Sequence, residues 1–147
     1  MTDHDSEFDV EQRQRNLTAV RVGIEAWGSG TGSPFPLLAD DATWEITGNS
    51  DAAGIYSSPA ELMTRVIVPL AARMSTPLIP VIRALYSDDD TVIALFDAEG
   101  LALDGQPYRN TYAWFMQFNG DRIVKATAFY DSVAFNDLWR RVTPMLD

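Results

Sequence analysis

Cysteine is absent from this sequence, and histidine occurs only once, at His4. Without cysteine the chain can form neither disulfide bonds nor thiolate metal sites. A single histidine in a polar amino-terminal segment argues against an imidazole-rich metal centre. It also argues against nucleophile systems in which histidine activates serine or cysteine. We therefore expect no metal ion and no cofactor.

Basic residues are also scarce, with 11 Lys and Arg against 21 Asp and Glu, so the formal net charge is −10. Binding to nucleic acid normally requires a basic face, and we expect no nucleic-acid partner. No apolar run approaches the roughly 20 residues that span a bilayer, and the amino terminus lacks the pattern of a secretion signal. The sequence predicts a cytoplasmic protein without a membrane partner.

The 147 residues are enough for one domain with its own core. We expect a single domain over residues 1–147, in which residues 1–8 form a mobile polar tail. From Asp9 the apolar residues follow helical spacing, and a Gly-rich loop at residues 28–34 ends the pattern. The residues on the buried face of this helix are Leu17, Val20, Ile24 and Trp27.

A second helix begins at Ser58, which is followed by Pro59 and Glu61. Serine at the N-cap, proline at the first helical position and glutamate at the third form a capping pattern. Pro69 lies inside the helical pattern that follows. Because proline cannot donate a main-chain hydrogen bond, we expect it to kink this helix or to divide it into two pieces.

Most of the remaining chain shows the apolar alternation of β-strands. The expected strands span residues 42–47, an edge segment that ends at residue 86, and residues 91–103, 108–118 and 123–130. A short helix with Phe135, Leu138, Trp139 and Val142 at helical spacing ends the chain. This order predicts an α+β fold in which a curved, mainly antiparallel sheet wraps around the amino-terminal helices as a cone-shaped barrel and encloses an apolar pocket.

Residues 106–138 carry the clearest pattern, with two long strands joined by a turn at residues 119–121. On the first strand both faces are largely apolar, so we expect one to cup a cavity and the other to be covered as well. One face carries Asn110, Tyr112, Trp114 and Met116, and the other carries Thr111, Ala113, Phe115 and Gln117.

No helix remains in the chain to cover the face that carries Phe115. An exposed apolar patch on a sheet normally marks a partner surface. We therefore expect a two-fold homodimer that packs sheet against sheet through the outer face, with Phe115 near its centre.

Three stretches resemble the SnoaL-like branch of the nuclear transport factor 2-like superfamily. They are LLADDATWEITG (residues 37–48), GIY (residues 54–56) and GQPYRNTYAWFMQFNGDRIVKATAFYDS (residues 105–132). The resemblance implies an α+β barrel around a deep apolar pocket, usually paired through the outer sheet face. It also implies a role in small-molecule chemistry or in binding, because relatives include ketosteroid isomerase, limonene-1,2-epoxide hydrolase, polyketide cyclase and non-enzymatic binding proteins.

The resemblance also implies site residues. Asp97 and Asp131 match the two aspartates of the epoxide hydrolase, although Leu95 stands where that enzyme has arginine. Trp44 and Ile46 stand where it has the tyrosine and asparagine that orient water. The isomerase positions for the proton-shuttling and oxyanion-binding aspartates correspond to Ile46 and Trp114, so the usual isomerase mechanism does not fit.

Asp97 and Asp131 are the candidate catalytic pair. If both line one pocket, one would act as acid and the other as base. The alternatives are that Asp97 lies in water or has a partner, and that Asp131 caps the terminal helix. The residues expected to line the ligand pocket are Trp27, Trp44, Ile46, Asn110, Tyr112, Trp114, Met116 and Phe129.

Polar groups within this set have two readings. Asn110 and Tyr112 either donate hydrogen bonds to a ligand or satisfy buried backbone groups and each other. Arg109 either reaches an acidic group of a substrate or forms a surface salt bridge.

Two functions are consistent with these features. The first is a cofactor-independent isomerase, hydrolase or cyclase that acts on an apolar, oxygenated small molecule through Asp97 and Asp131. The alternative is a non-catalytic protein that binds an apolar small molecule in the same pocket. The apolar residues Leu95, Ile46 and Trp114 motivate the alternative, because each stands where a relative has a polar catalytic group.

Overall fold

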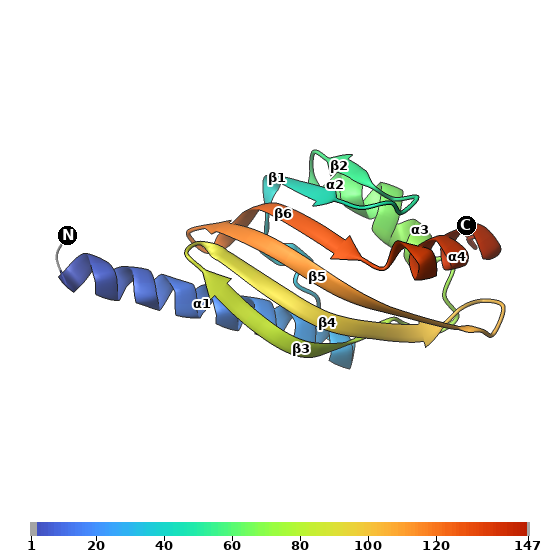
Figure 1. Ribbon diagram of the computed structural model, residues 1–147, viewed down its shortest axis with the longest axis horizontal. Coiled ribbons are helices and arrows are strands. Elements are labelled where there is room, and N and C mark those ends of the chain that lie inside the picture. Colours follow the sequence, from blue (N-terminus) through green and yellow to red (C-terminus); the bar gives the residue numbers. More distant parts are fainter. Residues whose placement is uncertain (1–2, 147) are drawn as a thin grey trace.

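A curved six-stranded sheet and the helices packed against it make up the fold (Figure 1). The computed structural model describes residues 3–146, with side chains from Val10 onward. The strand order is β2-β1-β6-β5-β4-β3, and neighbouring strands are antiparallel except for β1 and β6, which run parallel. The α+β class and the mainly antiparallel sheet are confirmed.

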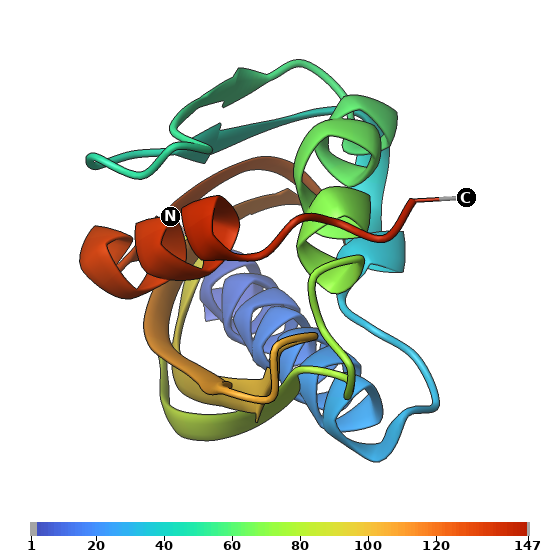
Figure 2. The ribbon, with the colours of Figure 1, turned by 90° about the vertical axis from the view of Figure 1, so that its right-hand side faces the viewer.

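The helical segments are α1 (Asp3–Ser29), the 3-10 turn η1 (Phe35–Leu37), α2 (Pro59–Leu62), the π-helical turn η2 (Met63–Ile67), α3 (Val68–Ala71) and α4 (Ser132–Arg141). The strands are β1 (Leu38–Ile46), β2 (Gly54–Tyr56), β3 (Ile79–Asp88), β4 (Thr91–Leu101), β5 (Pro107–Asn119) and β6 (Arg122–Tyr130). The sheet curves into the predicted cone, as the end-on view shows (Figure 2). The cone is open on one side, because the edge strands β2 and β3 do not pair with each other.

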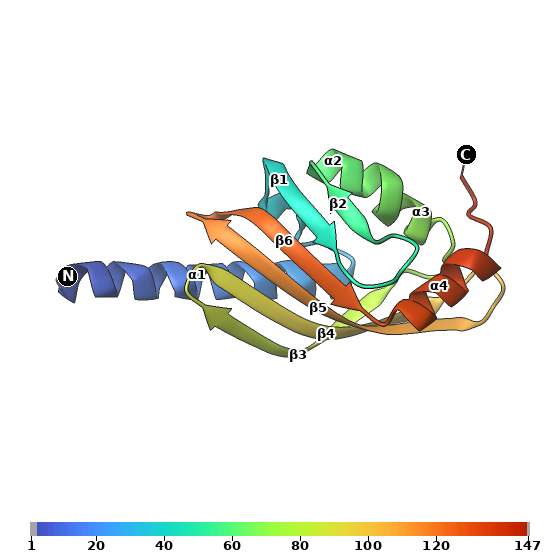
Figure 3. The same ribbon diagram turned by 45° about the horizontal axis from the view of Figure 1, so that its top comes forward.

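Helix α1 lies on the concave side of the sheet, against β3 and β4 (Figure 2). The predicted apolar stripe is confirmed, since Val20 and Ile24 are buried and Leu17 and Trp27 pack against the core. The helix begins at Asp3 rather than at Asp9, and its first turns extend beyond the sheet (Figure 3). Residues 3–8 of the predicted tail are therefore helical, whereas residues 1 and 2 lie outside the described part of the chain.

The described residues include no helix with the length and apolar character needed to cross a bilayer. The cytoplasmic location stays a prediction.

The second helix has the predicted cap and the predicted division. Ser58 Oγ accepts a hydrogen bond from Glu61 N at 3.1 Å, while Glu61 Oε2 accepts from Ser57 N at 3.0 Å. Between α2 and α3 the chain widens into the π-helical turn η2, which ends two residues before Pro69. Because proline has no N–H and its ring crowds the carbonyl four residues earlier, a wider turn lets the helix continue through this position.

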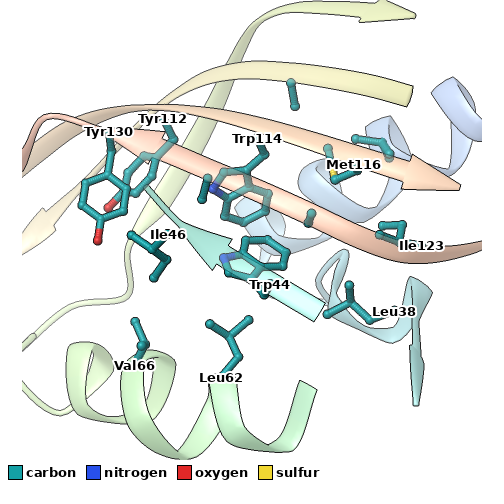
Figure 4. Packing of buried hydrophobic residues seen from close by; sticks show 14 of the residues in the cluster. Leu38, Trp44, Ile46, Leu62, Val66, Tyr112, Trp114, Met116, Ile123 and Tyr130 are labelled. Atoms are coloured by element: carbon teal, nitrogen blue, oxygen red, sulfur yellow. The ribbon is translucent and has the colours of Figure 1, made fainter. Parts of the chain in front are cut away.

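The inward face of β5 forms the centre of the core, which confirms the predicted alternation. Every second side chain on this strand is buried between the sheet and the helices (Figure 4). These residues are Tyr108, Asn110, Tyr112, Trp114, Met116 and Phe118.

The outer face of the sheet carries an apolar patch that no helix of the described chain covers. Phe115 is 40% exposed and pairs across the sheet with Ile93 on β4 and Thr127 on β6. Val81 on the edge strand β3 and Phe129 on β6 are also exposed. Exposed apolar side chains on the uncovered face of a sheet favour association. We propose that two copies pack through this face as a homodimer.

Phe115→Glu tests this proposal. A carboxylate at the centre of the patch would be buried without a partner, so the dimer should weaken by about 3 kcal/mol or more. Light scattering at micromolar concentration should report twice the chain mass for the wild type and a shift toward the monomer for the variant. Val22→Glu, which adds the same charge at an exposed position on α1, should leave the dimer intact. A wild type that stays monomeric at higher concentrations would contradict the proposal.

Candidate functional site

A cavity of about 500 Å³ lies between the concave face of the sheet and the α2–η2–α3 segment. Its wall on the sheet side comes from β1, β5 and β6, and its opposite wall comes from the helical segment. The loop at residues 74–78 and the end of α1 complete it. The lining residues are Trp27, Ser33, Phe35, Trp44, Ile46, Leu62, Val66, Ile67, Leu70, Ala71, Met74, Ser75, Thr76, Pro77, Leu78, Tyr112, Trp114, Ala128, Tyr130 and Phe135.

The local sequence explains why these side chains face the same space. Alternation along a strand points every second side chain inward, which places Trp44 and Ile46 of β1 beside Trp114 of β5 (Figure 4). On the other side, Leu62 and Val66 are four residues apart and so lie on one face of the helical segment, toward the sheet (Figure 4). The sheet and the helix present apolar surfaces to each other, but they do not close the space between them.

Aromatic rings form most of the inner wall. Trp44 and Trp114 meet edge to face, with ring centroids 5.0 Å apart, and Trp27 stacks on Trp114 at 6.0 Å. The ring centroid of Phe35 lies 5.8 Å from that of Trp44 and 5.8 Å from that of Trp114. Contacts of this kind hold large rings in fixed positions, so the cavity wall is preorganised.

Among the described residues that line the cavity, none carries a carboxylate, imidazole, ammonium or guanidinium group. Its deeper polar groups are phenols and indoles, and burial raises the pKa of Tyr112 and of Tyr130 well above the ordinary value of 10.0. Both phenols therefore stay neutral at physiological pH. The Tyr130 hydroxyl is hydrogen-bonded to Ser50 Oγ at 2.8 Å.

Asn110 faces inward at the far end of β5, but it does not line the cavity. Its Oδ1 accepts from Asp131 N at 3.0 Å, and its Nδ2 donates to Asp131 O at 2.9 Å and to the Tyr108 hydroxyl at 2.9 Å. The Tyr108 hydroxyl is in turn 2.7 Å from the hydroxyl of Tyr112. Of the two predicted readings of Asn110, the structure shows the one in which it satisfies buried backbone.

Five of the eight predicted ligand-binding residues line the cavity. They are Trp27, Trp44, Ile46, Tyr112 and Trp114. Asn110, as described above, and Met116, which is packed inside the core with 1% exposure, do not line it.

Phe129 was expected in the pocket, but it lies on the outer face and is 52% exposed. The reason is a bulge in β6. Phe118 pairs with Ile123, but Gln117 pairs with Lys125, so one extra residue enters β6 between them. Ile123 faces inward, and after the bulge the inward positions are Ala126 and Ala128, which turns Phe129 outward.

The structure places Asp97 and Asp131 outside the apolar cavity, along a shallow depression on the outer face. The Asp97 side chain is half exposed, accepts a hydrogen bond from Thr111 Oγ1 at 2.6 Å and lies 3.7 Å from Arg83. Outward alternation on β4 explains this position, because Phe96 and Ala98 on either side face inward. The two aspartates therefore do not form an acid and base pair in the cavity.

Asp131 is the N-cap of α4, and its Oδ1 accepts a hydrogen bond from Val133 N at 3.0 Å. Arg109 forms a surface salt bridge with Glu99 at 2.6 Å. Asp131 is therefore a helix cap and Arg109 a surface salt-bridge partner, as the second alternative for each residue had stated. Among the described residues, no group of three or more Asp, Glu or His side chains gathers where it could hold a metal ion.

The helical wall and the closing end of the cavity were not among the predicted pocket residues. Leu62, Val66 and Leu70 recur at helical spacing, but this spacing alone does not show whether the helix touches the sheet. Tyr130 continues the inward alternation of Ala126 and Ala128, and could have been found had the bulge been recognised. Phe135 reaches the cavity from α4.

Alanine substitutions separate the structural role of Asp131 from that of Asp97. Asp131→Ala removes a helix cap and should lower the free energy of unfolding by about 1 kcal/mol. Asp97→Ala removes a solvated ion pair and should change it by less than about 0.5 kcal/mol. Urea denaturation measures both effects. Equal, large losses of stability would show that the assigned roles are incorrect.

No protein-family model and no curated protein matches the chain, but solved structures resemble it. Bal32a, from a soil-derived mobile gene cassette, has 20% identity and a TM-score of 0.73, covering 88% of this chain and 99% of that chain. An NTF2-like protein of unknown function from Burkholderia pseudomallei K96243 has 16% identity and a TM-score of 0.69, and the match covers 84% of this chain and 96% of that chain. A candidate SnoaL-like polyketide cyclase from Jannaschia sp. CCS1 has 14% identity and a TM-score of 0.68, covering 86% and 92%. The chain therefore has the NTF2-like α+β cone fold.

Proposed function

We propose that this chain is a SnoaL-like protein that binds a neutral, apolar small molecule in the cavity between the sheet and the α2–η2–α3 segment. The observation that carries the proposal is the lining itself, which combines aromatic and aliphatic side chains with a few neutral hydrogen-bonding groups. Ligand sites of proteins are typically apolar cavities of about 300–1,000 Å³ with a small number of polar groups. The cavity volume of about 500 Å³ falls in this range.

The lining favours a neutral ligand over a charged one. A charged molecule would lose its hydration on entering the cavity, and no lining residue carries an opposite charge to compensate. Apolar burial would supply most of the affinity, at about 25 cal/mol for each Å² of surface removed from water.

An enzymatic alternative is a cofactor-independent isomerase, hydrolase or cyclase in the same cavity. Its support is the sequence resemblance and the structural similarity to a candidate SnoaL-like polyketide cyclase. Proton transfer at neutral pH needs a group that can both take up and release a proton. The lining offers phenols and indoles but neither a carboxylate nor an imidazole. We therefore favour binding over the acid–base chemistry expected from Asp97 and Asp131.

A cavity-filling substitution tests the binding proposal. Val66 points from the helical segment toward the sheet (Figure 4), and Val66→Phe should place a ring in the space that a ligand would take. The neutral dye N-phenyl-1-naphthylamine should bind the wild type at one site per chain with enhanced fluorescence, and the variant should bind at least tenfold more weakly. Ile55→Phe, a change at an exposed position on β2, should bind the dye like the wild type. Equal binding by all three proteins, or none by the wild type, would contradict the proposal.

Affinity for the dye should be constant from about pH 5 to pH 9. The titratable groups in the lining are tyrosines, and burial raises the pKa of Tyr112 and of Tyr130, so both stay protonated throughout this range. Titrations at several pH values check this expectation. A step in affinity near pH 4–6 would indicate that a carboxylate or a histidine takes part in binding.

A further inference from the structure

Two buried indole groups in the cavity wall have no hydrogen-bond partner. Trp44 and Trp114 are 4% and 5% exposed, and neither indole nitrogen donates to any acceptor in the described part of the chain. Among those residues, Nη2 of Arg141 is the one side-chain nitrogen or oxygen that has neither solvent-accessible surface nor a hydrogen-bond partner. Both indole nitrogens therefore keep some accessible surface. We infer that this surface faces the cavity, because both residues line it.

The orientation of the two rings agrees with this conclusion. The nitrogen-bearing edges of both indoles lie on the side of the cluster where Ile46 and Tyr112 are found (Figure 4). The edge-to-face packing of Trp44 on Trp114, and the stacking of Trp27 on Trp114, hold both rings in place. An indole N–H can only donate, so these groups can be satisfied only by an acceptor.

A third donor comes from the chain of hydroxyls that ends at Tyr112. Asp131 N can only donate and Asp131 O can only accept, so their contacts fix which end of the Asn110 amide carries the nitrogen. That nitrogen donates its second proton to the Tyr108 hydroxyl. The Tyr108 hydroxyl lies 2.7 Å from the Tyr112 hydroxyl, and either can donate to the other. When Tyr108 donates, the Tyr112 proton is left for a ligand.

We propose that the cavity selects a ligand with a carbonyl-type oxygen, which accepts hydrogen bonds from the indole N–H groups of Trp44 and Trp114 and from the Tyr112 hydroxyl. This inference rests on the proposed binding function and specifies its ligand class. The aromatic walls suit a ring system, and the donors require that one edge of it carries an acceptor. An alcohol can also accept from these donors, but its own proton then needs an acceptor, which the two indole N–H groups cannot supply.

Fluorenone and fluorene form a matched pair of test ligands, since they share a flat ring system and differ by a carbonyl group in place of a methylene. Moving a carbonyl out of water without a partner weakens binding. The wild type should nevertheless bind fluorenone at least as tightly as fluorene. The carbonyl stretching band of bound fluorenone should lie at lower wavenumber than in a hydrocarbon solvent, because a hydrogen-bonded carbonyl is weakened.

Conservative variants identify the donors. Trp44→Phe, Trp114→Phe and Tyr112→Phe each keep a ring and remove a donor. Each should lower the ratio of fluorenone affinity to fluorene affinity by about three- to tenfold. Phe35→Leu serves as the control, because Phe35 lines the cavity without a polar group and its loss should weaken both ligands equally. If a variant does not fold, the carbonyl band of the wild-type complex still decides the question.

The outcomes distinguish the two proposals. If both ligands bind, but the carbonyl band matches that in hydrocarbon and the variants leave the ratio unchanged, the selection of a carbonyl is contradicted and the binding function stands. If neither ligand binds to the wild type, both proposals are contradicted.

Discussion

The inward face of β5 is the surface on which the rest of the structure depends. Its buried side chains meet α1 near one end and the α4 cap near the other, and between these ends they face the cavity. The middle of the strand carries Tyr112 and Trp114, which line the cavity opposite the α2–η2–α3 segment. The cavity is the space that remains between the curved sheet and this helical segment.

The position of the helical segment has a local cause. The capped start at Ser58 and the wider π-helical turn before Pro69 fix the path of the helical segment. At its carboxyl end, Arg73 donates to the carbonyl groups of Trp139 and Val142 at 3.1 Å and lies over the Trp139 ring. These contacts tie the carboxyl end of the segment to α4, while α2 at its start packs against β1. The helical wall is thus supported at both ends, and the cavity lies between it and the sheet.

The two faces of the sheet differ in charge. The carboxylates of Asp97 and Glu99 on β4 lie on the outer face of the sheet, where water solvates them, and the lining of the inner cavity carries neutral donors. Burying an unpaired carboxylate in the aromatic wall would be costly, whereas a buried phenol remains neutral. The resemblance to catalytic relatives suggested the pair of Asp97 and Asp131 as a site, but alternation on β4 and the cap of α4 place both outside the cavity.

Patterns that depend on a single element could be predicted from the sequence. The stripe of α1, the Ser58 cap and the alternation of β5 follow from spacing and local chemistry, and Trp44 and Trp114 could be assigned to the pocket in this way. The position of Phe129 could not, because one extra residue in β6 reverses the alternation and no turn residue marks it. The extent of the cavity could not be predicted either. It depends on how far the helical segment lies from the sheet, and the residue pattern of each element does not contain this distance.

We propose that the space beside the paired tryptophans Trp44 and Trp114 is a ligand site. The most direct measurement is the indole ¹H–¹⁵N spectrum of the labelled protein during titration with a neutral apolar ligand. The signals of Trp44 and Trp114 should shift to saturation at one ligand per chain, while that of Trp139, which does not line the cavity, should stay in place. Ligand binding that leaves the Trp44 and Trp114 signals unmoved would contradict the proposal.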